Sequence, residues 1–328
     1  MSRHRIVCAL FAASFGLATV RQPEAVTQQA GLRMTYFGAA GWEITDGRTV
    51  VLVDPYFTRA KYATPNDPVS PDDPRPITTN ASIVASDTKT IDAHVTRADV
   101  IVITHTHPDH TLDLPYIAIK TGATVVGTES TATMCRLSGV PAAQLKVVSG
   151  HEALTFGSVS IRVIPSLHGI FRAPAPGAPA PRPPIFIAGA GPPFAYGQFQ
   201  EGGTLAYDVK IAGHEIVLFG SMNFIESELT GLHPDIALIG SKPERAFIEN
   251  YTPRLMNVLN HPRLVMPTHW DAFNVPYDYP QDRTLEQVKA FTEEVKAASP
   301  GTTVYVPERL KPVDVEALLK RIPAGIRH

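Results

Sequence analysis

The chain has 328 residues, of which 44% are hydrophobic and 18% are charged, and its formal net charge at pH 7 is −2. This length and composition allow a large buried core, as one large domain or two small ones. Because the net charge is close to zero, the composition excludes a basic footprint for nucleic acid or for an acidic membrane surface.

The first thirty residues have the pattern of an export signal. The basic segment Arg3-His-Arg5 precedes an apolar run from Ile6 to Val20, and Gly16-Leu-Ala18 offers a small-x-small cleavage site. The run is shorter than the roughly 20 apolar residues of a comfortable membrane span. We expect 1–30 to be a signal and leader, followed by one domain over 31–328 in a periplasmic or secreted protein. A cytoplasmic leader and an uncleaved anchor are the alternatives.

Three short segments with strand-forming sequences follow the leader. Arg33–Phe37, Trp42–Thr45 and Thr49–Val53 predict an antiparallel meander, with glycine-containing turns between them. The third strand stops before a proline and leaves Asp54 at its carboxyl end. Residues 56–98 then lack a clear period, and a segment of this length is usually functional or mobile.

Residues 99–110 combine a predicted strand with a cluster of potential metal ligands. An apolar, β-branched run ends just before four such residues within six positions: His105, His107, Asp109 and His110. Residues two apart in extended backbone point to the same side, so His105 and His107 are able to hold one ion together. Asp109 and His110 come after a proline, at the start of the next predicted helix, and face a second position. This spacing predicts a loop that serves two ions.

The central part of the chain alternates between predicted helices and strands. A helix over Thr111–Thr121 and a strand over Thr124–Val126 complete an α/β unit, and a second helix is expected over Glu129–Ser138. The predicted strands that follow are Leu145–Val148, Leu154–Phe156 and Val159–Ile164. The last of them leads directly to His168, so a histidine again comes just after a strand.

The next segments are a proline-rich stretch and a hairpin. Residues 173–184 contain too much proline for a helix or an inner strand, and they form either a lid over the site or a surface loop. Thr204–Ile211 and Glu215–Phe219 predict a hairpin, which ends at Gly220-Ser221.

The C-terminal part is expected to form the outer layer around one more histidine. Ser241-Lys-Pro-Glu244 fits a capping box, in which the glutamate side chain serves the start of a helix. A strand over Arg263–Met266 leads to His269, and Thr284-Leu-Glu-Gln287 caps a further helix that ends at Ser299.

The motif His105-Thr-His107-Pro-Asp109-His110 resembles the H-x-H-x-D-H signature of the metallo-β-lactamase superfamily. Three further stretches resemble, in order, its ascorbate-phosphate lactonase-like branch, which includes N-acylphosphatidylethanolamine phosphodiesterases: Val51-Leu-Val-Asp54-Pro-Tyr, Pro165-Ser-Leu-His168-Gly and Pro267-Thr-His269-Trp. The resemblance covers the chain from about Gly31 onward. It implies an α/β fold of the four-layered αββα type, whereas periodicity alone indicates only α/β.

The resemblance also implies two sets of metal ligands. The first is expected to contain three histidines, and the second an aspartate and two histidines: His105, His107, His168; Asp109, His110, His269. Asp54 is expected to orient a ligand histidine, although a simple turn residue before proline is nearly as consistent with the sequence. The aromatic residues of the 56–98 loop, Tyr56, Phe57 and Tyr62, are expected either to border the substrate cleft or to form a small core.

Ser221 is the main departure from the family pattern. Many members carry an aspartate there, and its carboxylate bridges the two metals, whereas the neutral hydroxyl of Ser221 offers no charge to offset two cations. One metallo-β-lactamase subclass also has serine at a bridging position and still has both ligand sets. We therefore expect one or two ions.

The expected chemistry follows from the ligands. Imidazole and carboxylate ligands without thiolate suit Zn²⁺, and also Mn²⁺ or Fe²⁺. A bound divalent ion lowers the pKa of its water from about 15.7 to about 7. The resemblance thus implies a hydrolase in which metal-bound hydroxide attacks a cyclic ester or amide, or a phosphodiester, of a small-molecule substrate. Asp109 would hold the hydroxide and pass a proton to the leaving group. An exported metallo-β-lactamase and a non-catalytic binding protein that has lost the second metal are the alternatives.

Overall fold

The computed structural model describes residues 31–63, 68–170 and 191–322. The predicted export signal and the proline-rich stretch of residues 173–184 lie outside the described residues. Among the described helices, none has the length and apolar character needed to span a membrane.

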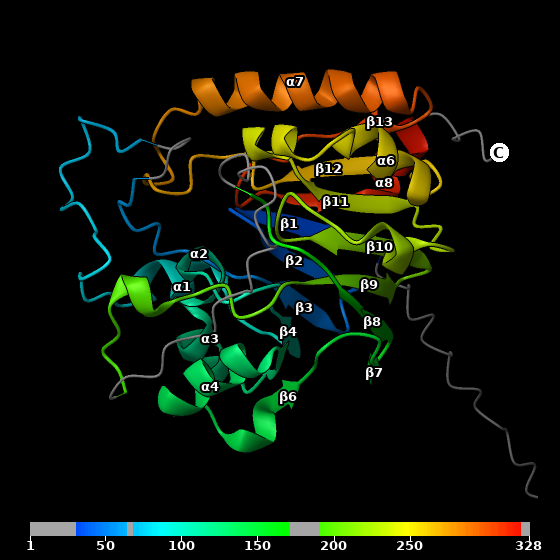
Figure 1. Cartoon of the computed structure of the whole chain (residues 1–328). Coiled ribbons are helices and arrows are strands. Elements are labelled where there is room, and N and C mark those ends of the chain that lie inside the picture. The colour runs from blue at the N-terminus through cyan, green and yellow to red at the C-terminus, as the bar shows by residue number, and fades with distance from the viewer. Residues whose placement is uncertain (1–30, 64–67, 171–190, 323–328) are drawn as a thin grey trace, which may run out of the picture.

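Two seven-stranded sheets form the centre of the fold (Figure 1). In the first sheet the strands are ordered β14-β1-β2-β3-β4-β5-β6, and in the second β13-β12-β11-β10-β9-β8-β7. In each sheet, three neighbouring pairs are antiparallel and three are parallel. The strands of the first sheet are β1 (Arg33–Gly38), β2 (Gly41–Thr45), β3 (Val50–Val53), β4 (Val100–Val102), β5 (Thr124–Gly127), β6 (Leu145–Val147) and β14 (Pro312–Asp314). Those of the second are β7 (Ala153–Phe156), β8 (Val159–Pro165), β9 (Leu205–Ile211), β10 (His214–Phe219), β11 (Ile236–Gly240), β12 (Leu264–Thr268) and β13 (Thr303–Val304).

Helices cover the outer face of each sheet, as Figure 1 shows. The α-helices are α1 (Thr88–His94), α2 (Pro108–Thr111), α3 (Leu114–Thr121), α4 (Glu129–Leu137), α5 (Glu226–Leu229), α6 (Tyr251–Val258), α7 (Asp282–Ala298) and α8 (Val315–Arg321). Alternate side chains of the strands face opposite ways, so each sheet contributes to two apolar layers. Val102 and Leu218 belong to the core between the sheets, Ile101 packs toward α3, and Val217 packs toward α6 and α7. The predicted αββα sandwich is therefore confirmed.

The expected helix over Thr111–Thr121 is interrupted in the structure. Helix α2 ends at Thr111, and α3 begins at Leu114 with Pro115 in its first turn, where a missing N–H costs nothing. Asp113 lies between the two helices, and its carboxylate accepts hydrogen bonds from the backbone N–H groups of Phe57 and Thr58. Asp113, at the break between the two helices, thus fixes the start of the 56–98 loop.

Two other local expectations were wrong, and the three strands β11, β13 and β14 were not predicted. Helix α7 begins at Asp282, so Thr284 is inside the helix, and its hydroxyl donates to the Gln281 carbonyl oxygen. Strand β11 was not predicted, because its five residues are all buried and show no alternation. The capping box at Ser241–Glu244 also does not form: the 3₁₀ helix η3 spans Pro243–Phe247 and has no side-chain cap.

His214 connects three elements at one end of the sandwich and carries a pH-dependent part of the stability. Its Nδ1 lies 2.5 Å from Asp235 Oδ2, and its Nε2 lies 2.8 Å from Glu316 Oε1 in α8. The hydrogen bond with Asp235 raises the pKa of His214 to about 9, with a further contribution from Glu316 against the opposing effect of burial.

A raised pKa means that the folded state binds this proton more tightly than the unfolded state, whose ordinary value is about 6.5. The stabilisation is therefore complete below about pH 6.5 and is lost as the pH rises through about 9. We expect the Tm of His214→Gln to lie about 2–4 °C below that of the wild type at pH 6, a shift of about 1 kcal/mol. The gap should close by pH 10; an equal gap at both pH values would contradict the assignment.

Candidate metal centre

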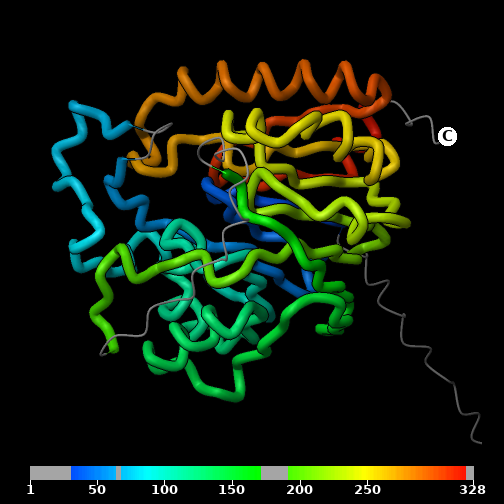
Figure 2. Tube along the Cα trace, viewed as in Figure 1, coloured from blue at the N-terminus to red at the C-terminus, as the bar shows by residue number. Residues whose placement is uncertain are grey.

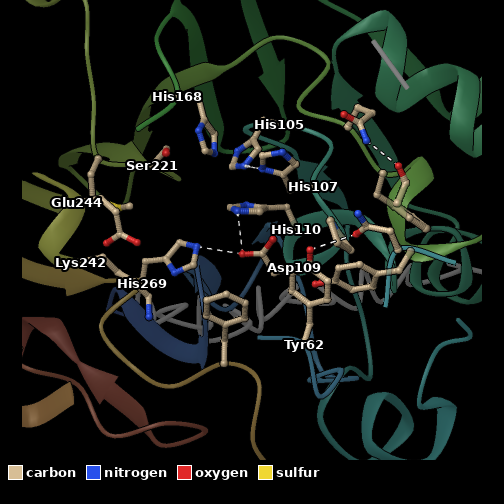
Figure 3. A pocket seen from close by; sticks show the side chains of 18 of the residues that line it. Tyr62, His105, His107, Asp109, His110, His168, Ser221, Lys242, Glu244 and His269 are labelled. Atoms are coloured by element: carbon tan, nitrogen blue, oxygen red, sulfur yellow. Dashed lines mark hydrogen bonds and ion pairs between the residues drawn. The ribbon is translucent and has the colours of Figure 1, made fainter. Parts of the chain in front are cut away.

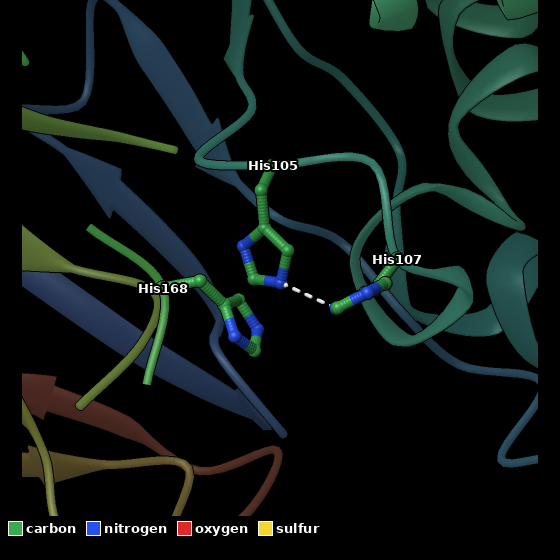
Figure 4. A group of neighbouring side chains, drawn as sticks. All are labelled: His105, His107 and His168. Carbon is green, nitrogen blue, oxygen red and sulfur yellow. Dashed lines mark hydrogen bonds between the residues drawn. The ribbon is translucent and has the colours of Figure 1, made fainter. Parts of the chain in front are cut away.

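Three histidines converge at the carboxyl ends of two strands, one from each sheet. His105 and His107 follow β4, and His168 follows β8. Their ligand nitrogens all lie within 4.8 Å of one another, and His105 Nε2 is 3.1 Å from His107 Nδ1. Figure 4 shows the three rings meeting edge to face around a common point.

The protonation of these histidines suits metal binding. Burial lowers the pKa of His107 to about 4 and that of His168 to about 3, and it lowers the pKa of His105 well below its ordinary value. The rings are therefore neutral at pH 7, which is the form that ligates metals. His168 Nδ1 lies 2.7 Å from the Gly169 carbonyl oxygen, so this nitrogen carries the proton and Nε2 offers its lone pair.

The second group contains Asp109 and His110 from α2 and His269, which follows β12. Their ligand atoms also lie within 4.8 Å of one another, and Asp109 Oδ2 is 3.1 Å from His269 Nε2. Burial alone raises the pKa of Asp109, but His110 and His269 outweigh that effect and hold the pKa well below its usual range. The group thus offers one anionic and two imidazole ligands.

Asp54 contacts His110 directly, as the resemblance implies. Asp54 Oδ2 lies 2.8 Å from His110 Nδ1, and the same carboxylate accepts hydrogen bonds from the backbone N–H and the hydroxyl of Thr104. The contact places the His110 proton on Nδ1 and leaves Nε2 for a metal. Gly220 packs against this arrangement so closely that a Cβ there would lie 1.9 Å from Thr104 Oγ1. Only glycine fits at the end of β10.

Ser221 supports a histidine rather than supplying charge. Its Oγ accepts a hydrogen bond of 2.9 Å from the backbone N–H of Gly169, the residue after His168, and the side chain is 3% exposed. The serine therefore holds the loop that carries His168.

The two groups fit divalent ions. His105 Nε2 and His107 Nδ1 face each other at 3.1 Å in neutral rings, of which the first is buried and the second half-buried, and a shared cation or proton must stabilise this arrangement. The six predicted ligands are brought together in two sets, and the donor chemistry does not distinguish Zn²⁺ from Mn²⁺ or Fe²⁺. The remaining described histidines lie outside both sets: His94, His151, His214, His233 and His261.

Both ligand groups line one cavity of ≈ 420 Å³ (Figure 3). Three of its aromatic lining residues, Tyr62, Tyr196 and Phe199, come from two loops that lie side by side in Figure 2. The first loop comprises residues 56–63 and 68–87, and the second comprises residues 191–203. Backbone hydrogen bonds from Tyr196 N to Ser82 O and from Gly197 N to Asn80 O join these loops. The rings of Tyr62 and Tyr196 stack with centroids 4.5 Å apart.

The aromatic residues of the 56–98 loop divide between the two expected roles. Tyr56 and Phe57 belong to the core below the first sheet, whereas Tyr62 lines the cavity. Sequence reasoning missed Lys242, Glu244 and Phe273, which also line it. The sequence feature that could have indicated Lys242 and Glu244 is their position after β11, which matches the position of His269 after β12.

The fold has two mixed sheets between helical layers, and two histidine-rich groups lie at the ends of its strands. This combination is typical of metallohydrolases. The model of a beta-lactamase superfamily domain matches residues 33–269. The chain belongs to the metallo-β-lactamase superfamily and is a metal-dependent hydrolase.

One curated relative is described as a metal-dependent hydrolase from Heliobacterium modesticaldum; it is 28% identical over 257 residues, which cover 74% of this chain and 84% of the relative. The solved structure of Igni18, a metallo hydrolase from Ignicoccus hospitalis, matches with a TM-score of 0.53 at 17% identity, over 86% of this chain and 97% of that one. CmlA, a diiron β-hydroxylase from Streptomyces venezuelae, matches with a TM-score of 0.53 at 15% identity, over 88% of this chain and 55% of that one. These two likenesses show the fold alone.

Proposed function

We propose that this enzyme hydrolyses a small molecule that carries a cyclic ester or amide, or a phosphodiester. The observation that supports this reaction is that both ligand groups line the same cavity, so a single substrate is able to reach both. A bound divalent ion would polarise the substrate oxygen and make water acidic enough to supply a nucleophile at neutral pH.

Asp109 is the residue we propose for proton transfer. The residue is 9% exposed and lines the cavity, and its carboxylate stays ionised at neutral pH because His110 and His269 lower its pKa against the effect of burial. An anionic Oδ2 beside the cavity is able to accept a proton from water and return it to the leaving group. The aromatic lining residues favour a substrate with an apolar or planar part beside the bond that breaks.

A β-lactamase is the second candidate. The sets of three histidines and of one aspartate with two histidines, together with Ser221, support it, and the signal-like residues 1–30 support an exported enzyme. Lactones and phosphodiesters remain the first choice because the wider motifs resemble the lactonase-like branch.

A substrate screen tests the proposal. The purified protein, loaded in turn with zinc, manganese and iron, would be assayed against lactones, β-lactams and bis-nitrophenyl phosphate, beside His107→Ala. Iron is included because CmlA is a diiron protein. We expect turnover of one class and a loss of about 10³-fold in kcat/KM in the variant. No turnover of any of these substrates with any metal would contradict the proposed substrate classes.

A further inference from the structure

The loop after β11 places a buried carboxylate against the cavity, and one of its oxygens has no hydrogen-bonding partner among the described residues. Glu244 is 2% exposed, and among the described residues its Oε2 has no hydrogen-bond partner. Figure 3 shows Glu244 on the same side of the cavity as Ser221 and His269. Burying an ionised oxygen without a partner is energetically unfavourable. A carboxylate in this position therefore calls for a cationic or proton-donating group in the cavity.

The charged residues that line the cavity also indicate that Glu244 faces a cationic group. Asp109 and Glu244 are the two carboxylates among the described lining residues, and Lys242 adds a positive charge. Where many family members have a bridging carboxylate, the chain has Ser221, whose hydroxyl is already engaged by Gly169 N. Two divalent ions would thus face one anionic ligand, Asp109, and five neutral imidazoles. Glu244 is the remaining side chain in this lining that is able to offset their charge.

Glu244 is not placed as a direct ligand. The ligand atoms of Asp109, His110 and His269 lie within 4.8 Å of one another, and Glu244 is outside that group. A carboxylate just beyond the direct ligands acts on a metal through the electric field or through an intervening water, and such groups typically change metal affinity about 10–100-fold.

We propose that Glu244 supplies the negative charge that residue 221 lacks, and that it stabilises the ion held by Asp109, His110 and His269. This inference rests on the proposed function in one respect, because it requires the second ligand group to hold an ion. The enzyme would then have a dinuclear site in which Glu244, in the loop after β11, supplies the carboxylate that is missing after β10.

Zinc titration in competition with a chromophoric chelator tests the proposal without an activity assay. We expect the wild type to bind about two equivalents, and Glu244→Gln to bind the second about 10–100-fold more weakly with the first unchanged. Glu286→Gln removes the same charge from an exposed position on α7 and should leave both affinities as they are. Thermal unfolding of the metal-free proteins controls for folding, and Glu244→Gln should be no less stable than the wild type because it removes an unpartnered charge.

Substitutions at residue 221 test independently whether the second ion lacks a negative charge there. Ser221→Asp should tighten the second equivalent, whereas Ser221→Asn, which has nearly the same shape, should not. In the Ser221→Asp background, Glu244→Gln should have a smaller effect than in the wild type, because the two carboxylates serve one purpose. Two equivalents of unchanged affinity in Glu244→Gln would overturn the role of Glu244 and leave the proposed function intact. One equivalent in the wild type would overturn both the inference and the dinuclear site.

Discussion

His110→Ala is expected to lower the metal content of the purified protein from about two equivalents to about one and to reduce kcat/KM by about 10³-fold. His110 is 1% exposed and belongs to the second ligand group with Asp109 and His269. Without its ring, that group keeps two ligands, too few for stable binding of a divalent ion, while the three-histidine group is untouched. Elemental analysis of the dialysed protein and steady-state kinetics measure the two effects.

The control for this variant is His94→Ala. His94 is exposed on α1, and its ring stacks on Phe57 away from both ligand groups. It should leave metal content and turnover at wild-type values. If the wild type holds only one equivalent, and His110→Ala holds the same, Ser221 marks a lost second site.

Asp271→Ala is expected to lower the free energy of unfolding by about 3–5 kcal/mol, because it leaves a buried cation without its anion. Asp271 is fully buried, and its Oδ2 lies 2.7 Å from Arg59 Nη2, with Arg59 itself 1% exposed. The other carboxylate oxygen accepts hydrogen bonds from the Tyr36 hydroxyl and the Ala39 backbone N–H. Urea unfolding of the metal-free protein measures the loss.

Two comparisons isolate the cause of that loss. Glu308→Ala breaks an exposed ion pair with Lys311 and should cost no more than about 1 kcal/mol. The double variant Arg59→Met with Asp271→Leu removes both charges and should be more stable than Asp271→Ala. A double variant that is less stable than Asp271→Ala would show that packing, and not the unpaired charge, dominates.

The same contact positions a predicted metal ligand, His269. The His269 backbone N–H donates to the Ala39 carbonyl oxygen at 2.6 Å, and Asp271 holds the N–H of Ala39, so the β1–β2 turn fixes the loop that carries His269. Gly38 is required in this turn, because its φ is +101° and a Cβ would lie 2.5 Å from Arg59 Nη1. We expect Asp271→Ala to weaken the second metal equivalent as well as the fold.

Local sequence patterns were sufficient where the interactions are local. The strand that ends before His105 is a continuous apolar run, and the spacing from His105 to His110 reflects an extended loop followed by a helix start. The family order of motifs then led to His168 and His269. The structure brings all six residues together in two groups, but their binding of metal remains a prediction.

The chain by itself determined most of the strands and the cluster from His105 to His110, because these follow from neighbouring residues and their spacing. The family resemblance added the later ligand-bearing loops and the absence of a carboxylate at Ser221. Only the tertiary structure decided the partners that are far apart in sequence. Arg59 and Asp271 are 212 residues apart, and Tyr62 meets Tyr196 across two loops without a period. Glu244 fits a helix cap in sequence but lines the cavity in the structure. Helix η3 has no side-chain cap, and β11 ends beside the candidate metal centre. Such contacts depend on how the two sheets bring their strand ends together, and this arrangement has no signature in any short stretch of sequence.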